Sequence, residues 1–245
     1  PASHGRKMPP TKTSSASDSN QAEGLLLVDK PAGITSHDAV QVVRRAYDQS
    51  SVGHLGTLDP FATGLLVMLL GRSTRLATFI DGDPKVYEAV IAFGSETNTD
   101  DLTGDMVRTA AAPAEKDVLS AVKDLTGRID QVPPAFSAKQ IDGKRAYVSA
   151  RKGEQVELKP VSVEIFEWKI ESFSEGMLRA TISCSGGTYI RSLARDLGRA
   201  TGSAAHLAAL RRTRSGDFDV ANAVSLDAIK SQPPAPVLLQ VVPRT

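Results

Sequence analysis

The sequence contains very little cysteine, few aromatic residues and no long hydrophobic run. Its single cysteine, Cys184, excludes an intramolecular disulfide and argues against a cysteine-based metal site. The longest apolar run, residues 65–70, is far shorter than the roughly 20 residues of a membrane-spanning helix. These absences predict a soluble protein that suits a reducing compartment and has no membrane partner.

An excess of charge of one sign is also missing, since the net charge is only +1 over 245 residues. Any surface for an acidic partner must therefore come from local clustering. One stretch, residues 191–214, contains six arginines and no acidic residue except Asp196. The arginines are Arg191, Arg195, Arg199, Arg211, Arg212 and Arg214. Because a guanidinium can bind phosphate bidentately, this stretch favours phosphate binding over the alternative of a solvated charged face.

Composition divides the chain into three parts. Residues 1–23 are rich in Ser, Thr and Pro and almost devoid of apolar residues, which predicts a disordered N-terminal tail. Residues 24–222 have the apolar content of one folded domain, and residues 223–245 are expected to form only a short C-terminal tail. The tail at the N-terminus lacks the apolar core of a secretory signal. A bacterial cytoplasmic location is therefore expected, with an organelle as the alternative if this segment remains from a transit peptide.

Hydrophobic periodicity predicts strands and helices in an irregular order. Strands are expected at residues 25–28, 65–70, 86–93, 161–170 and 178–185, the last two as a pair. Helices are expected after a cap at Thr35 or Ser36 and at residues 73–80, 116–125, 191–200 and 204–210. Residues 129–141 should be extended, with a turn at Asp142-Gly143, and residues 98–105 should form a polar loop without calcium-loop spacing. Because no βαβ unit repeats, the predicted fold class is α+β.

The most informative segment is Gly-His-Leu-Gly-Thr-Leu-Asp-Pro-Phe-Ala-Thr-Gly at residues 53–64. Gly56 and Gly64 permit a tight backbone path, and Pro60 restricts Asp59 to extended or turn geometry. Local chemistry supports two interpretations: a turn whose Asp caps the next element, or a loop that holds one carboxylate in a fixed place.

This segment resembles the catalytic motif of the TruB family of tRNA pseudouridine synthases. Three further segments resemble the family's motifs in the family's order: Leu-Leu-Leu-Val-Asp-Lys-Pro-Ala-Gly at 25–33, Lys-Val-Tyr-Glu-Ala at 85–89 and Gly-Thr-Tyr-Ile-Arg at 187–191. The resemblance extends from about residue 24 to about residue 220. It implies a pseudouridine synthase fold with a mixed, largely antiparallel central sheet and flanking helices and loops.

The resemblance also implies the roles of individual residues. Asp59 corresponds to the nucleophile, and Arg191 to its ion-pair partner, although Arg191 could instead bind phosphate with its neighbours. Tyr87 corresponds to the residue that stacks on the target uracil. A phenol with a pKa near 10 is a poor general base at neutral pH, so stacking is the expected role.

The remaining assignments are less specific. Tyr189 corresponds to a second pocket tyrosine and Leu210 to an apolar wall under the base, although either could be ordinary core. His54 corresponds to a residue near the flipped nucleotides, and Lys30 is expected to be mainly structural. Arg195, Arg199, Arg211, Arg212 and Arg214 are the predicted phosphate contacts.

The implied activity is isomerisation of the T-loop uridine of tRNA, uridine 55, after base flipping. The partner is then the T arm of tRNA, with no obligate protein partner and a monomeric enzyme expected. No cofactor or metal is expected, because the isomerisation needs none and the sequence contains no His/Cys cluster, Walker loop or dinucleotide fingerprint. The C-terminal PUA-type module of many family members is expected to be absent or truncated.

Three alternative functions remain open. An RNA-binding chaperone for tRNA folding could use the same surface with lost or secondary catalysis. A glycoside hydrolase would need a second carboxylate, and the matched motifs contain none. A guide-RNA-dependent synthase of the wider family is the third alternative.

Overall fold

The computed structural model describes residues 21–80, 82–135, 140–141, 144–145 and 158–237. The predicted disorder of the first residues and the predicted turn at Asp142-Gly143 lie outside this range. The strands are β1 (Gly24–Lys30), β2 (Val52–Leu55), β3 (Thr63–Leu70), β4 (Lys85–Phe93), β5 (Ser95–Thr97), β6 (Met106–Thr109), β7 (Gly127–Gln131), β8 (Gln140–Ile141), β9 (Lys144–Arg145), β10 (Val161–Ser174), β11 (Met177–Cys184), β12 (Ala205–Ser215), β13 (Phe218–Asp219) and β14 (Val224–Ser225). The helices are α1 (Ser36–Ala46), α2 (Glu115–Asp124), α4 (Ile190–Ala200) and α5 (Leu226–Ser231), with 3₁₀ helices η1 (Gly71–Leu76) and η2 (Val220–Asn222).

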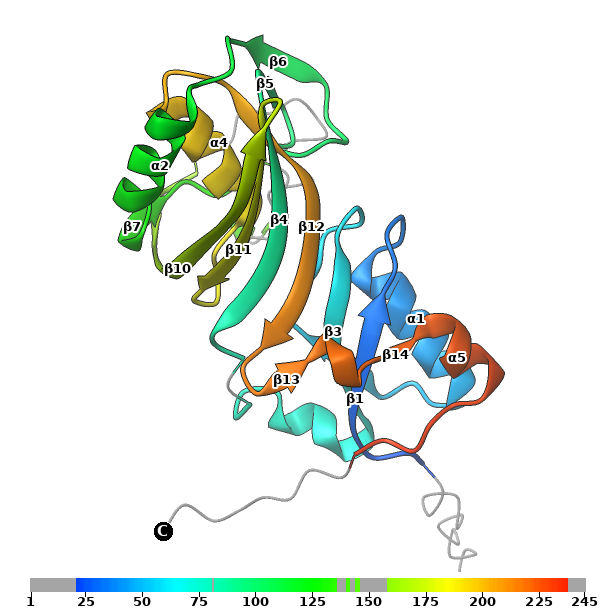
Figure 1. Ribbon diagram of the computed structural model, residues 1–245. Coiled ribbons are helices and arrows are strands. Elements are labelled where there is room, and N and C mark those ends of the chain that lie inside the picture. Colours follow the sequence, from blue (N-terminus) through cyan, green and yellow to red (C-terminus); the bar gives the residue numbers. More distant parts are fainter. Residues whose placement is uncertain (1–20, 81, 136–139, 142–143, 146–157, 238–245) are drawn as a thin grey trace, which may run out of the picture.

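One mixed sheet organises the described part of the chain (Figure 1). Its strand order is β14-β1-β3-β12-β4-β11-β10-β7, with β2 added beside β3 and β13 beside β12. Most neighbours are antiparallel, whereas β12 runs parallel to β3 and β14 runs parallel to β1. The fold is therefore α+β, as the sequence predicts.

Helices cover the two ends of this sheet separately. In Figure 1, α2 and α4 lie over the end that contains β7 and β10, while α1 and α5 lie beside β1 and β14. Each pair of helices has its own apolar cluster, since Leu193 and Val118 pack with β4, β11 and β12, whereas Val43 and Ile229 pack with β1 and β3. None of the described helices is long and apolar enough to cross a membrane.

Local signals in the sequence account for several of these elements. Thr35 is the N-cap of α1: its side chain accepts a hydrogen bond from the Asp38 backbone N–H, and the Asp38 carboxylate accepts one from the Thr35 N–H in a capping box. The expected strands at 25–28, 65–70 and 86–93 are confirmed as parts of β1, β3 and β4. The pairing expected between residues 161–170 and 178–185 is confirmed as β10 and β11.

The helix expected at residues 204–210 is wrong, because these residues begin strand β12. Their alanines have high helix propensity, which a local pattern reads as helix. In the fold, however, β12 lies between β3 and β4 and hydrogen-bonds to both. Long-range strand pairing therefore overrides the local preference.

The residues after 222 continue to pack on the domain as far as residue 237. Val224 pairs with Val28 of β1, and Val237 exchanges two backbone hydrogen bonds with Leu25 at 2.8 and 2.9 Å. Helix α5 lies beside α1. The domain boundary at residues 222–223 remains a prediction.

Candidate active site

Asp59 lies in the loop between β2 and β3, and the backbone of this loop is fixed from several sides. Ser36, the first residue of α1, accepts a hydrogen bond from the Leu58 N–H at 2.9 Å and donates one to the Leu58 carbonyl at 3.0 Å. Lys30 is fully buried and donates to the carbonyls of Pro31 and Ile34 at 2.8 Å, and to that of Pro60 at 3.4 Å. Burial lowers the pKa of Lys30 to about 8. These contacts agree with the structural role expected for Lys30.

Gly56 and Gly64 of the motif serve the tight path that the sequence predicts. Gly56 and Gly64 have φ values of 75° and 100°, in the region that favours glycine. At Gly64 a Cβ atom would lie 2.3 Å from the Arg212 carbonyl oxygen on the neighbouring strand. A side chain there would therefore separate β3 from β12.

The carboxylate of Asp59 is held by the guanidinium of Arg191. Arg191 Nε donates to Asp59 Oδ2 at 2.9 Å, and Nη2 donates to Asp59 Oδ1 at 3.0 Å. The Arg191 side chain is 5% exposed, whereas that of Asp59 is 32% exposed. The ion pair implied by the resemblance is thus present as a bidentate pair. Part of the Asp59 carboxylate remains exposed to the pocket.

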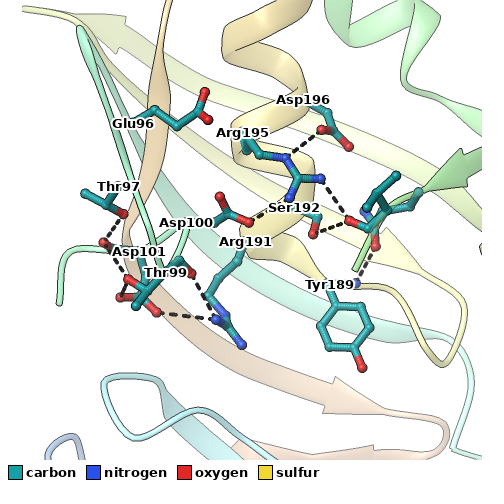
Figure 2. Close-up of polar contacts among 12 residues, drawn as sticks. Glu96, Thr97, Thr99, Asp100, Asp101, Tyr189, Arg191, Ser192, Arg195 and Asp196 are labelled. Atoms are coloured by element: carbon teal, nitrogen blue, oxygen red, sulfur yellow. Dashed lines mark hydrogen bonds and ion pairs between the residues drawn. The ribbon is translucent and has the colours of Figure 1, made fainter. Parts of the chain in front are cut away.

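The remaining donor of Arg191 is held by the segment between β5 and β6. Its Nη1 donates to the Thr99 carbonyl at 2.9 Å and lies 3.7 Å from Asp101 Oδ2. Figure 2 shows Arg191 extending from α4 toward Thr99 and Asp101. Thr99 and Asp101 therefore hold the Arg191 guanidinium in the position from which it bonds Asp59.

Burial and charge act against each other on Asp59. Burial raises the pKa of its carboxyl above the ordinary value of 3.8, Arg191 opposes this rise, and the negative charge of Asp101 adds to it. Lys30 opposes the rise as well, more weakly than Arg191. Arg191 is therefore the group that most strongly opposes this rise and favours the ionised form of the half-buried carboxylate.

The pocket around Asp59 has a volume of about 270 Å³. Predicted residues that line it are Asp59, Tyr87, Tyr189, Arg191, Leu210 and Arg212. Lys85 lines it as well and lies 3.3 Å from Asp83. A larger groove of about 770 Å³ adjoins it, sharing Leu210 and including Pro60 and Phe61. A flat ring can therefore be enclosed beside Asp59 while the neighbouring groove accommodates a larger molecule.

The two tyrosines differ in their surroundings. Tyr87 lies on β4 with 7% exposure and belongs to the apolar core, so its face of the strand, which the sequence left open, is the buried one. Burial raises the pKa of the Tyr87 phenol, and the nearby Arg212, which hydrogen-bonds its hydroxyl, opposes this less strongly. Tyr189 is the N-cap of α4, and its backbone N–H donates to Gln131 Oε1 at 2.8 Å. Because the pKa of Tyr87 is raised, its phenol suits stacking better than proton abstraction.

His54 is not brought into the lining of this pocket. It lies on β2 opposite Met68 of β3, and its Nδ1 is buried without a hydrogen-bond partner among the described residues. Burial lowers the pKa of His54, and the charges of Arg212 and His37 act in the same direction. Across the described ranges, no cluster of three His, Cys, Asp or Glu side chains is arranged to hold a metal ion.

Two of the predicted phosphate contacts, Arg195 and Arg212, are buried and have partners inside the protein. Arg195 is 7% exposed and bonds Asp100 and Asp196, and Arg212 is 1% exposed and donates to the carbonyls of Leu65 and Gly56 at 2.8 and 3.0 Å. These internal bonds give both guanidinium groups a structural role, and phosphate binding by them stays a prediction.

The other three predicted phosphate contacts keep some exposure. Arg199 bonds Glu96 with a side chain that is 55% exposed, and Arg211 forms a bidentate pair with Asp29 with 36% exposure. Arg214 is exposed, and its Nε donates to the Gly216 carbonyl at 2.8 Å. Phosphate binding by these residues remains a prediction.

Sequence reasoning missed Asp101, Thr99 and Gln131, which hold Arg191 and Tyr189. Thr99 and Gln131 give no signal in the sequence. Thr99 contributes its backbone carbonyl, which every residue has, and the side-chain amide of Gln131 lies far from Tyr189 in sequence. The acidic pair Asp100-Asp101 gives a signal, since it could be matched to the arginines of residues 191–200, but residues 98–105 were expected only to form a polar loop without calcium-loop spacing.

Comparisons with known proteins agree with this architecture. A family model described as "TruB family pseudouridylate synthase (N terminal domain)" matches residues 44–190, and one described as "tRNA pseudouridylate synthase B C-terminal domain" matches residues 191–233. The structure resembles that described as "Crystal Structure of a Cbf5-Nop10-Gar1 Complex", with a TM-score of 0.67 and 27% identity over 86% of this chain. The match covers only 55% of that chain.

Curated relatives are more similar in sequence. The chain is 50% identical to "tRNA pseudouridine synthase B" of Leifsonia xyli subsp. xyli (strain CTCB07), over 84% of this chain and 72% of the relative. It is 47% identical to the protein of that name from Thermobifida fusca (strain YX), over 86% and 75% respectively. For Bordetella parapertussis (strain 12822 / ATCC BAA-587 / NCTC 13253) the identity is 44%, over 87% and 89%.

The fold and its pocket define the class as that of the pseudouridine synthases. Within that class, the family match over residues 44–190 and the identity to relatives over 72% to 89% of their length are decisive. The chain belongs to the TruB family of pseudouridylate synthases.

Proposed function

We propose that this chain isomerises the T-loop uridine of tRNA, uridine 55, to pseudouridine. The observation that carries the proposal is the bidentate pair of Asp59 and Arg191 at a pocket lined by Tyr87, Tyr189 and Leu210. The family and the names of the relatives supply the substrate class. The reaction breaks the bond between ribose C1′ and uracil N1, rotates the base and rejoins it through C5, whose proton is then lost.

Asp59 acts in this reaction as an ionised carboxylate beside the glycosidic bond. Each route open to it requires ionisation, whether the carboxylate attacks the base, attacks C1′ or drives glycal formation. Arg191 supplies the positive charge that a partly desolvated carboxylate needs. Because one face of the carboxylate stays exposed to the pocket, the same contact that holds Asp59 leaves it accessible to substrate.

The pocket accommodates a base that has left its stack. Base flipping costs on the order of a few kcal/mol. Tyr87 and Tyr189 can stack on the uracil and Leu210 can support its other side, which offsets this cost. The adjoining groove along Pro60 and Phe61 is the place where we expect the rest of the loop to lie. Because Asp59, Arg191 and the pocket residues come from one chain, the proposed reaction requires no second subunit.

The test is incubation of the purified chain with unmodified tRNA, without metal, cofactor or guide RNA, followed by mapping of pseudouridine at single-nucleotide resolution. Asp59→Asn should retain tRNA binding and lose the signal at uridine 55. Asp29→Asn is the matched control, because it also removes a carboxylate from a bidentate arginine pair, but outside the pocket. Pseudouridine made by Asp59→Asn would exclude Asp59 as the nucleophile, while tRNA binding without any product from the unmodified chain would favour the chaperone alternative.

A further inference from the structure

Arg195 lies one helical turn after Arg191 on α4, and its side chain connects three parts of the chain. Its Nη1 donates to Asp100 Oδ2 at 2.8 Å, its Nη2 to the Val132 carbonyl at 2.8 Å, and its Nε to Asp196 Oδ1 at 3.0 Å. Figure 2 shows this side chain between Asp100 and Asp196. All three nitrogens are therefore used inside the protein, and the pair with Asp100 is buried on both sides, at 9% side-chain exposure each.

Asp100 stands between the two residues that hold Arg191. The Thr99 carbonyl and the Asp101 carboxylate face Arg191, while the Asp100 side chain turns to Arg195 (Figure 2). The Asp100 backbone has a φ of 60°, which costs a residue other than glycine free energy. The ion pair with Arg195 stabilises this conformation, and with it the placement of Thr99 and Asp101.

The rest of the segment is anchored by the backbone of β12. Leu207 N–H donates to the Asp100 carbonyl at 3.0 Å, and Leu102 N–H donates to the Leu207 carbonyl at 3.0 Å. These bonds fix the position of the segment along β12. The distance between the segment and α4 is set by side chains instead. Arg191 and Arg195 of α4 bond the segment within residues 99–101.

We propose that Arg195 is a positioning residue for the pseudouridine synthase reaction: through Asp100 it holds Thr99 and Asp101 on Arg191, and so fixes the guanidinium that grips Asp59. The inference rests on the proposed function, because the reaction defines what the positioning serves. Arg195 touches neither Asp59 nor the pocket. Its effect therefore falls on the geometry of the catalytic pair, where a displacement of about 1 Å can lower a rate by roughly 100-fold.

The variant Arg195→Met should fold, because removal of the arginine need not leave a buried charge. Burial raises the pKa of Asp100 to about 6, so the carboxyl can take up a proton when its partner is lost. The matched control is Arg108→Met. Arg108 lies on β6 of the same hairpin, where it bonds Glu96 of β5 and joins the hairpin to the domain through the Ser203 carbonyl. Its substitution leaves the bonds of residues 99–101 in place.

The experiment measures kcat and KM for unmodified tRNA and the pH dependence of kcat. For Arg195→Met we expect a kcat roughly 10- to 100-fold lower, an unchanged KM within about twofold, and an acid limb moved to higher pH. The limb moves because a loosened Arg191 opposes the raised pKa of Asp59 less well, whereas Lys30 and Asp101 still face that carboxyl. Arg195→Lys should recover part of kcat, and adding Asp100→Asn to Arg195→Met should cost little more.

Several outcomes would overturn the inference. They are an unchanged kcat in Arg195→Met, a rise in KM with kcat intact, and an equal loss of kcat in Arg108→Met. If circular dichroism shows that Arg195→Met is unfolded, Asp100→Asn alone decides: a lower kcat at unchanged KM supports the inference, and an unchanged kcat refutes it. Absence of product from the unmodified chain under the same conditions would refute the proposed function instead, so the two failures are distinguishable.

Discussion

The arginines of α4 and those of β12 come from one stretch of sequence, yet the fold uses them in different ways. The helix triplet is Arg191, Arg195 and Arg199, and the strand triplet is Arg211, Arg212 and Arg214. In the helix triplet the spacing of four places all three side chains on one face, and each bonds a carboxylate: Asp59, Asp100 and Glu96 respectively. In the strand triplet Arg212 is buried, and alternation places the half-buried Arg211 on the other face of the strand. Arg214 is exposed and follows an irregularity in the pairing with β4 between Arg212 and Arg214, which breaks the alternation.

The difference shows that the bonding partners around an arginine decide its role in the fold. The helix triplet meets acidic residues from the segment after β4, so its charges are neutralised in a row that leads from Arg199 to the pocket. Arg212 meets backbone carbonyls and the Tyr87 hydroxyl, so its charge is dispersed over neutral acceptors. The arginines of the two triplets that keep some exposure, Arg199, Arg211 and Arg214, are the ones for which phosphate binding remains a prediction.

The largest effect is expected at the end of the helix triplet that reaches the pocket. Arg191→Met removes the partner of Asp59, and kcat should fall by roughly 100- to 1,000-fold. Burial already raises the pKa of Asp59, and loss of the opposing guanidinium raises it further. The acid limb of the pH profile, where Asp59 becomes protonated, should therefore move to higher pH. The measurement is a pH profile of kcat under single-turnover conditions.

The control is Arg199→Met, at the other end of the same helix face, which should leave the position of this acid limb unchanged. A profile for Arg191→Met that falls uniformly at every pH, with its acid limb in place, would contradict the electrostatic role of Arg191. It would leave only a steric one.

The next largest effect is expected at the centre of the strand triplet. Arg212→Met leaves the Leu65 and Gly56 carbonyls without their donor inside the protein, which should lower the free energy of unfolding by about 3 kcal/mol. Arg211→Met removes a partly exposed pair with Asp29 and should cost less than about 1 kcal/mol. Urea unfolding checks both values, with an unchanged slope for each variant. Equal losses would mean that burial does not separate these two arginines.

A smaller effect distinguishes Glu96 from Asp100, the carboxylates that pair with Arg199 and Arg195 of the helix triplet. Burial would raise the pKa of Glu96, but Arg199 and then Arg108 hold it below its ordinary value of 4.5. For Asp100 burial prevails over Arg195 and raises the pKa to about 6. Carbon-13 NMR titration of the carboxyl groups should therefore find Glu96 and Asp100 on opposite sides of their ordinary values.

The two shifts act on stability with opposite signs. Glu96 contributes stability that is fully present above pH 4.5 and is lost as the pH falls through its lower folded pKa. Asp100 binds a proton more readily in the folded chain, so it lowers stability progressively as the pH rises from 3.8 to about 6. Asp100→Asn should remove that pH dependence, and its persistence in the variant would assign it to another group.

Much of the fold could be predicted because its signals are local. The cap at Thr35, the apolar run of β3 and the alternation in β10 and β11 each depend on residues that adjoin in sequence. Residues 204–210 could not be predicted in this way. The strand with which they pair, β4, lies far from them in sequence.

The site divides along the same line. The composition of its loop draws attention to Asp59 but leaves open whether the residue only caps the next element. Its role as nucleophile and its pairing with Arg191 come from the resemblance of motifs that lie far apart. The roles of Arg195 and Arg212 could not be predicted, because Asp100 and the Leu65 carbonyl reach them only through the folded sheet. A cluster of one charge in a sequence therefore predicts phosphate binding only until the distant carboxylates are known.

The smallest effect is expected at Arg214, the exposed member of the strand triplet. Arg214→Ala should leave stability and kcat unchanged, raise KM for tRNA a few-fold, and reduce the salt dependence of tRNA binding by about one phosphate contact. Arg212→Met, in contrast, should leave the salt dependence unaltered in molecules that remain folded, because its guanidinium is 1% exposed. Binding titrations at several salt concentrations measure both slopes. An unchanged slope for Arg214→Ala would remove the strand triplet from the RNA surface, and would leave Arg199 as the partly exposed candidate on the helix triplet.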